Sequence, residues 1–255
     1  MCFSNKPTGP GKSSVKATFE SAQVANGCSS FGSKGEVRID GVILDLDGLV
    51  LDTEIGYWFA WKHAAKSMGF KVSNSFLETL SGLDSKEVRR RLMVFFGEEF
   101  EWREFTRLSN EFWYRYVWKR GIPVKRGVLS CLALFEQKGI PYCLATNSHR
   151  ANALKCLELA GLGGRFDLIV ARDDVSFGKP SPEVFLLASA RLAVGADRCL
   201  VLEDSRSGVA GARAAGAFTV LVPSMSRNDP STRRLAHREC RDLQQVCERL
   251  AVLWS

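Results

Sequence analysis

The 255-residue chain lacks the residue patterns that mark several kinds of functional site. It has eight cysteines but no Cys-x-x-Cys pair, and its three histidines are not grouped at zinc-ligand spacing. No apolar run is long enough to span a bilayer, and the N-terminus has no apolar segment of a secretory signal. These absences predict a cytoplasmic protein with no membrane partner and with reduced cysteines, none of which we assign to catalysis.

Acidic residues are in the minority, since 35 Lys and Arg exceed 28 Asp and Glu and give a formal net charge of +7. Clustered basic residues can bind nucleic acid through its phosphates. The basic residues here are spread along the chain, and their densest patches, 89–91 and 227–241, lie in sequence with helical character. A solvated helix face explains them better, so we expect no nucleic-acid partner; the charge can still attract small phosphorylated anions.

Residues 1–37 have little apolar periodicity and are rich in Ser, Gly and Lys, which predicts a flexible extension. Glu20 is the only acidic residue before Glu36, and this scarcity leaves an organelle-targeting peptide as the alternative. The absence of Arg before Arg38 counts against that alternative.

Beyond residue 40, short apolar runs alternate with amphipathic segments. Of all residues in the chain, 45% are hydrophobic. The length allows one large domain, or a core domain with an insertion. The alternation predicts an α/β fold with a doubly wound, Rossmann-like parallel sheet covered by helices on both faces. The expected strands are 41–46, 140–145, 167–171, 198–202 and 218–222, and the expected helices are 127–138, 150–160, 182–193, 206–215 and 232–251.

Residues 54–123 interrupt this alternation with helical periodicity and no convincing strand. The stretch is too long for one crossover and predicts an inserted helical cap. It holds five of the six tryptophans, and Phe105, Leu108 and Phe112 recur at helical spacing, which favours a packed bundle core over a ligand-stacking surface. The expected organisation is the extension 1–37, a core domain of 38–53 and 124–255, and a cap of 54–123.

Two carboxylates two residues apart, Asp45 and Asp47, follow the apolar run Val42-Ile43-Leu44. The continuous β-branched run suits a strand buried on both faces, and Gly48 permits a sharp turn that exposes both acids. A nucleophile and a proton donor can be presented together by such a pair. The alternative is an inert, solvated acidic loop.

Three further strand or loop ends carry polar residues, and in open α/β sheets ligands bind beyond the carboxyl ends of the strands. Thr146-Asn147-Ser148 offers a hydroxyl and turn amides to a phosphoryl oxygen, Lys179 precedes a helix, and Glu203-Asp204 ends the strand 198–202. Each has an ordinary alternative as a helix cap, a surface charge or a loop. Together, in this order and at one sheet edge, they favour a shared site.

These four ordered motifs resemble those of the haloacid dehalogenase superfamily of phosphohydrolases, over residues 40–225. The resemblance implies that Asp45 is the nucleophile that becomes an aspartyl phosphate, and that Asp47 protonates the leaving alcohol and then activates water. The dehalogenases of the superfamily lack an acid at the second position, so Asp47 favours phosphatases and phosphomutases.

The same resemblance implies a Mg²⁺ cofactor, because the site offers the hard oxygen ligands that this ion prefers. The metal would be held by the Asp45 side chain, the Asp47 backbone carbonyl and Asp204, with Glu203 as a further direct or water-mediated ligand. Thr146, Asn147 and Lys179 would hold the transferring phosphoryl group. The helical cap would close over the site and contact the leaving group.

The nearest resemblance is to the β-phosphoglucomutase-like branch, with its sugar-phosphate phosphatases and pseudouridine-5′-phosphatases. A mutase is the less favoured alternative because the cap histidine it implies is Tyr57 here, and its basic cap residues fall on Ser81 and Ser85. We therefore expect a monomeric Mg²⁺-dependent phosphomonoesterase of a small phosphorylated metabolite, a sugar phosphate or a nucleoside monophosphate. The other alternative is a phosphate-binding protein without turnover, which has little need for the pair Asp45 and Asp47.

Overall fold

The computed structural model describes residues 38–80, 85–224 and 230–255. The predicted extension 1–37 and Ser81 lie outside the described residues, as do the first residues of the basic stretch 227–241. Within the described residues no helix has the length and apolarity needed to cross a membrane.

The core is a six-stranded sheet in which every neighbouring pair of strands is parallel, in the order β3-β2-β1-β4-β5-β6. The predicted α/β, doubly wound fold is confirmed, and all five predicted strands are present. Because β1 lies in the middle of the sheet, its carboxyl end adjoins those of β2 and β4. The strands are β1 (Gly41–Leu44), β2 (Tyr142–Ala145), β3 (Ile169–Val170), β4 (Cys199–Glu203), β5 (Phe218–Leu221) and β6 (Arg238–Glu239).

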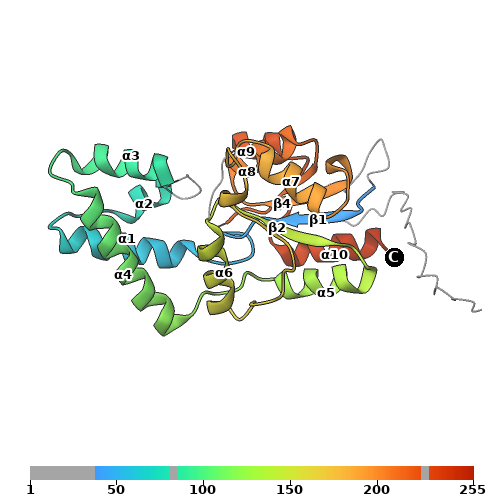
Figure 1. Ribbon diagram of the computed structural model, residues 1–255, viewed down its shortest axis with the longest axis horizontal. Coiled ribbons are helices and arrows are strands. Elements are labelled where there is room, and N and C mark those ends of the chain that lie inside the picture. The colour runs from blue at the N-terminus through green and yellow to red at the C-terminus, as the bar shows by residue number, and fades with distance from the viewer. Residues whose placement is uncertain (1–37, 81–84, 225–229) are drawn as a thin grey trace, which may run out of the picture.

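Helices cover both faces of the sheet, as Figure 1 shows. Alternate β1 side chains enter different apolar clusters: Val42 and Leu44 pack with residues of α5, α6 and α10, whereas Ile43 packs with residues of α7 and α8. This period-2 burial explains why the β1 sequence is apolar throughout. The helices of the core are α5 (Val128–Lys138), α6 (Arg150–Leu159), α7 (Glu183–Arg191), α8 (Arg206–Ala214), α9 (Pro230–Leu235) and α10 (Leu243–Leu253).

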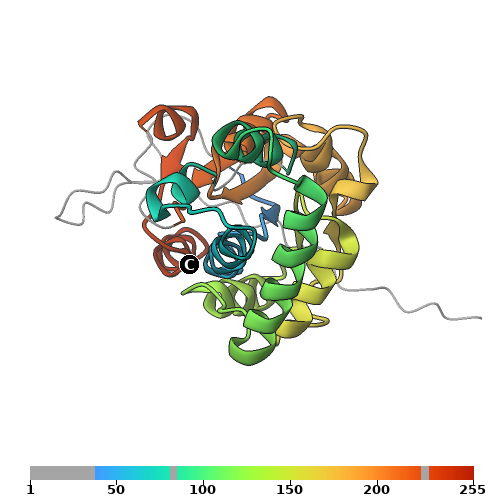
Figure 2. The ribbon, with the colours of Figure 1, turned by 90° about the vertical axis from the view of Figure 1, so that its left-hand side faces the viewer.

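Four helices from the predicted cap segment lie at one end of the molecule (Figures 1 and 2). They are α1 (Glu54–Ser67), α2 (Asn74–Leu80), α3 (Ser85–Phe96) and α4 (Trp102–Arg120). Their apolar side chains form a cluster of their own around Leu77, Leu92 and Phe105, with Trp58, Trp61 and Trp102 packed against it. The expected bundle core is present, although Trp118 is 85% exposed.

The two chain segments that connect this helical unit to the sheet pair with each other. Leu51 and Val124 form an isolated antiparallel bridge, the Asp52 amide donates to Pro123 O at 2.9 Å, and the Lys125 amide donates to Val50 O at 3.0 Å. The two connections between the helical unit and the sheet therefore form one short, hydrogen-bonded ribbon.

The prediction of a single helix over 232–251 is wrong. The segment contains α9, the strand β6 and α10, and β6 pairs with β5 through Val220 with Arg238 and Leu221 with Glu239. The edge of β5 offers backbone partners that helical periodicity cannot reveal. Asp242 then begins a new helix, because its Oδ1 accepts the Gln245 amide at 2.8 Å.

Candidate active site

Asp45 and Asp47 follow β1 at the centre of the sheet edge, in a turn that requires glycine at position 48. Gly48 has φ +89°, and a Cβ there would lie 2.2 Å from Asp204 Oδ2. The positive φ and the lack of a side chain let the loop after β1 pass directly over the end of β4. Gly48 thereby brings the first and fourth motifs together, as predicted.

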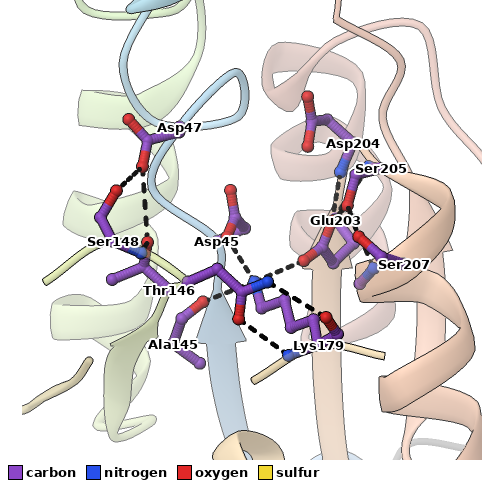
Figure 3. A network of polar contacts seen from close by, with 12 residues as sticks. Asp45, Asp47, Ala145, Thr146, Ser148, Lys179, Glu203, Asp204, Ser205 and Ser207 are labelled. Carbon is purple, nitrogen blue, oxygen red and sulfur yellow. Dashed lines mark hydrogen bonds and ion pairs between the residues drawn. The ribbon is translucent and has the colours of Figure 1, made fainter. Parts of the chain in front are cut away.

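Lys179 reaches this site from the loop before α7, and its ammonium group is buried between two carboxylates (Figure 3). Nζ donates to Asp45 Oδ1, to Glu203 Oε1 at 2.6 Å and to the Ala145 carbonyl at 2.7 Å. All three donors of the ammonium are therefore used. The four predicted motifs meet in one cluster, since Ala145 directly precedes Thr146.

Burial and charge act in opposite directions on these groups. Burial raises the pKa of Asp45 to about 7, against the opposing effect of the Lys179 charge and with smaller contributions from Glu203 and Asp47. Burial alone would lower the pKa of Lys179, but the charges of Asp45 and Glu203 raise it above its ordinary value. Lys179 thus stays charged, and it favours the ionised form of Asp45 that a nucleophile needs.

Glu203 is fully buried, and both of its carboxylate oxygens are occupied within the protein. Oε1 accepts from Lys179, while Oε2 accepts from the Asp204 amide, the Ser205 amide and the Ser205 hydroxyl, each at 3.0 Å. Its contacts favour a role in fixing Lys179 and the β4–α8 turn over direct metal coordination. Ser205, which the sequence analysis did not single out, also caps α8 by accepting the Gly208 amide.

Substitution of Gly208 tests this buried arrangement. A Cβ at position 208 would lie 1.8 Å from Glu203 Oε1, so Gly208→Ala must displace the carboxylate that holds Lys179. We expect a loss of about 1–3 kcal/mol in the free energy of unfolding, together with reduced turnover. Gly163→Ala is the matched control, because its Cβ would meet its nearest atom at 3.8 Å. Equal stabilities of the two variants by denaturant titration would show that the Glu203 site tolerates the added methyl group.

Hydroxyl groups hold the Asp47 carboxylate from two sides. Thr53 Oγ1 donates to Oδ1 at 2.9 Å. Ser148 Oγ donates to Oδ2 at 2.7 Å, and Thr146 Oγ1 is farther from the same oxygen at 3.4 Å (Figure 3). Thr53 immediately precedes α1, so the segment that leads into the helical unit helps to orient Asp47. The sequence analysis missed Thr53, and it included Ser148 in the second motif without expecting it to contact Asp47.

Removal of one of these hydroxyls should impair turnover more than substrate binding. We expect Ser148→Ala to lower kcat about tenfold with a smaller change in KM, because Asp47 loses a charge-assisted hydrogen bond that orients it. Ser148→Thr keeps the hydroxyl and should retain more activity. Ser130→Ala, on the exposed face of α5, is the matched control. Steady-state kinetics that show equal kcat for Ser148→Ala and the control would exclude this role.

Asn147 uses its side chain to hold the backbone of Lys179. Oδ1 accepts the Lys179 amide at 2.8 Å, and Nδ2 donates to the Lys179 carbonyl at 3.2 Å. Gly178 makes this approach possible, because a Cβ there would lie 2.5 Å from Asn147 Oδ1. Asn147 therefore positions the third motif, and its role as a phosphate ligand stays a prediction.

The carboxylates at this edge fit a hard cation. One oxygen each from Asp45, Glu203 and Asp204 lies within 4.8 Å of the others, and all three residues are buried. Oxygen donors grouped in this way suit Mg²⁺. Because Glu203 is saturated by internal donors, Asp45 and Asp204 are the side chains best able to ligate it.

Comparison with known proteins agrees with this geometry. A family model described as haloacid dehalogenase-like hydrolase matches residues 39–216. The chain belongs to this family. The resemblance inferred from the four motifs and the expected class of enzyme, a haloacid dehalogenase-like phosphatase, are both confirmed.

Individual relatives of this haloacid dehalogenase-like hydrolase include both phosphatases and a mutase. The chain is 32% identical to the phosphorylated carbohydrates phosphatase of Thermotoga maritima, with 75% of this chain and 88% of that protein covered. It is 30% identical to the β-phosphoglucomutase of Bacillus subtilis, with 71% and 82% covered. Among solved structures, a HAD family hydrolase from Deinococcus radiodurans with bound phosphate and sodium has a TM-score of 0.69 and 25% identity, with 85% and 97% covered.

Proposed function

We propose that the protein is a Mg²⁺-dependent phosphomonoesterase that acts on a small phosphorylated metabolite through an aspartyl-phosphate intermediate. The observation that carries the proposal is the environment of the acid pair. Asp45 is buried against Lys179, whereas Asp47 is held by two neutral hydroxyls. The Lys179 charge favours the ionised form of Asp45, the form that attacks, and the two hydroxyls orient Asp47 for proton transfer.

In the first step, a free oxygen of Asp45 attacks phosphorus and the bond from phosphorus to the ester oxygen breaks. Asp47 gives its proton to the departing alkoxide, which leaves as the alcohol. In the second step, Asp47 takes a proton from water as that water attacks the phosphorus of the aspartyl phosphate. The bond from phosphorus to Asp45 breaks and inorganic phosphate is released. Asp45 is again a free carboxylate, and Asp47 again carries its proton.

The surrounding residues stabilise the charge that moves in these steps. Lys179 lies against Asp45 and would neutralise charge on the transferring group, and Thr146 and Asn147 would contribute polar contacts at the same edge. Mg²⁺ would be held by Asp45, Asp204 and the Asp47 carbonyl, with Glu203 as a water-mediated ligand. It would neutralise charge between the nucleophile and the phosphate.

We assign substrate recognition to the cap. In this division the core comprises residues 38–53 and 124–255, and the cap comprises residues 54–123. The separate apolar cluster of the helical unit and the paired connecting ribbon support this division. Closure of the cap would exclude water and present its residues to the leaving group. A monomer suffices for this arrangement, because core and cap come from one chain.

The β-phosphoglucomutase relative makes a phosphomutase the second candidate. Tyr57, at the position where that branch implies a cap histidine, supports hydrolysis instead. Burial and the nearby Asp47 charge raise the pKa of Tyr57 above its ordinary value, so it does not exchange a proton near neutrality as histidine does. Its hydroxyl accepts from Asn152 Nδ2 at 3.4 Å.

Phosphate release from a panel of hexose phosphates, pentose phosphates and nucleoside monophosphates, with Mg²⁺ or with EDTA, tests the proposal. We expect metal-dependent release that selects among the sugar and nucleoside esters. Isomerisation of a hexose phosphate primed by a sugar bisphosphate, faster than hydrolysis of that bisphosphate, would favour the mutase. No turnover under either regime would overturn the phosphatase assignment.

A further inference from the structure

Two helices that contribute no residue to the carboxylate site, α5 and α10, run side by side beneath the sheet (Figure 1). Their first turns are in close contact, because a Cβ on Gly127, the residue before α5, would lie 2.0 Å from the Gln244 amide nitrogen and 2.4 Å from the Leu243 carbonyl carbon. Only glycine allows the two backbones to approach this closely.

One helical turn beyond this contact, each helix carries a cysteine. Cys131 lies four residues after Gly127, and Cys247 lies four residues after Leu243. Cys131 Sγ donates to the Leu243 carbonyl at 3.2 Å, and that residue is one turn before Cys247 on the same helix. Beyond the effect of burial, the nearby Cys247 thiol also raises the pKa of Cys131, as expected for side chains that approach each other across the interface.

We propose that Cys131 and Cys247 are a site of reversible disulfide formation that fastens the C-terminal helix α10 to α5. Cys247 is half-buried and Cys131 is fully buried, so the oxidant meets Cys247 first. Cys131 is a member of the main apolar cluster, and Cys247 packs against the same cluster.

The chemistry balances with a peroxide as oxidant. The Cys247 thiolate attacks one peroxide oxygen, the O–O bond breaks, and a sulfenic acid and one water form. The Cys131 sulfur attacks the sulfenic sulfur, its proton leaves with the hydroxyl as a second water, and the S–S bond forms. Two thiols are oxidised and one hydrogen peroxide is reduced to two waters.

The environment of the pair favours a reduced resting state. Burial raises the pKa of both thiols, and less thiolate means slower attack on the oxidant. The disulfide is therefore a response to sustained oxidation. Its bond would close a long loop that contains β2 to β6, and a cross-link of this kind stabilises a protein mainly by restricting its unfolded chain.

Oxidation of the full chain with hydrogen peroxide, followed by alkylation and peptide mapping without reductant, tests this site. We expect one intramolecular cross-link between the peptides of Cys131 and Cys247, reversed by dithiothreitol. The oxidised wild type should unfold about 5 °C or more above the reduced wild type, a comparison that needs no variant.

Two variants fix the assignment. Cys247→Ser should abolish both the cross-link and the thermal shift. Cys240→Ser, which removes a buried cysteine close to Cys131, should retain them. Three results would each overturn the proposal: a Cys131–Cys240 cross-link, a cross-link between two chains, or full alkylation of both thiols after oxidation.

Discussion

Asp45→Asn should abolish turnover, with kcat reduced by about 10⁴-fold or more. The amide cannot form the acyl phosphate, and loss of the nucleophile from other hydrolases costs up to about 10⁶-fold. The shape of the side chain is retained, and Lys179 keeps its ion pair with Glu203. The effect should therefore fall on chemistry. Phosphate release by the purified variant, at enzyme concentrations high enough to detect one turnover, measures it.

Asp167→Asn, an exposed carboxylate of the same core, is the matched control and should keep wild-type activity. Stability supplies an independent measurement. Since the pKa of Asp45 rises from 3.8 to about 7 on folding, the folded metal-free protein holds a proton there that the unfolded chain has released. Wild type should lose stability relative to Asp45→Asn as pH rises through this window. A parallel pH dependence of the two proteins in EDTA would contradict the assigned burial of Asp45.

Lys179→Met should be the most destabilising single substitution at the site. Methionine fills a similar volume but leaves Asp45 and Glu203 buried without their cation. Removal of one partner from a buried ion pair costs about 3–5 kcal/mol, and the free energy of unfolding should fall by this amount. Turnover should fall by about 10²–10³-fold as well, because a charge that faces the transferring group is lost.

The control for Lys179→Met is Lys155→Met, which breaks the exposed pair with Glu158 at 3.2 Å and should cost about 0.5 kcal/mol or less. The double variant Lys179→Met/Glu203→Gln should regain part of the lost stability, since it removes one unpaired charge. Denaturant titration of the four proteins decides the point. Equal losses for Lys179→Met and Lys155→Met would show that the buried cluster contributes no more than a surface pair.

The sheet and the meeting of the four motifs could be predicted because each rests on local pattern. Val42-Ile43-Leu44 is apolar throughout, as a central parallel strand must be, and parallel strands bring their polar ends to one edge. Residue type then restricted the chemistry, since Asp45, Asp47, Asp204 and Lys179 suit phosphoryl transfer.

The parts that sequence could not predict depend on contacts between distant segments. The strand β6 forms only because the edge of β5 is open to it, so helical periodicity over 232–251 was misleading. The hydroxyls of Thr53 and Ser148 become site residues only when the two segments converge on Asp47. The saturation of Glu203 and the use of Asn147 to hold Lys179 likewise depend on side-chain geometry that no spacing rule contains.

The central claim is that Asp45 carries the phosphoryl group during turnover, and acid-quenched mass spectrometry tests it most directly. The Asp47→Asn variant lacks both the acid of the first step and the base of the second, so it should be mixed with Mg²⁺ and an aryl phosphate, whose leaving group needs no acid. The reaction should be quenched within one turnover and the protein digested with a protease active at low pH. The account predicts one added phosphoryl group on the peptide that contains Asp45, absent from Asp45→Asn. Substrate turnover by wild type without any such adduct in the variant or the wild type, or an adduct on another peptide, would contradict it.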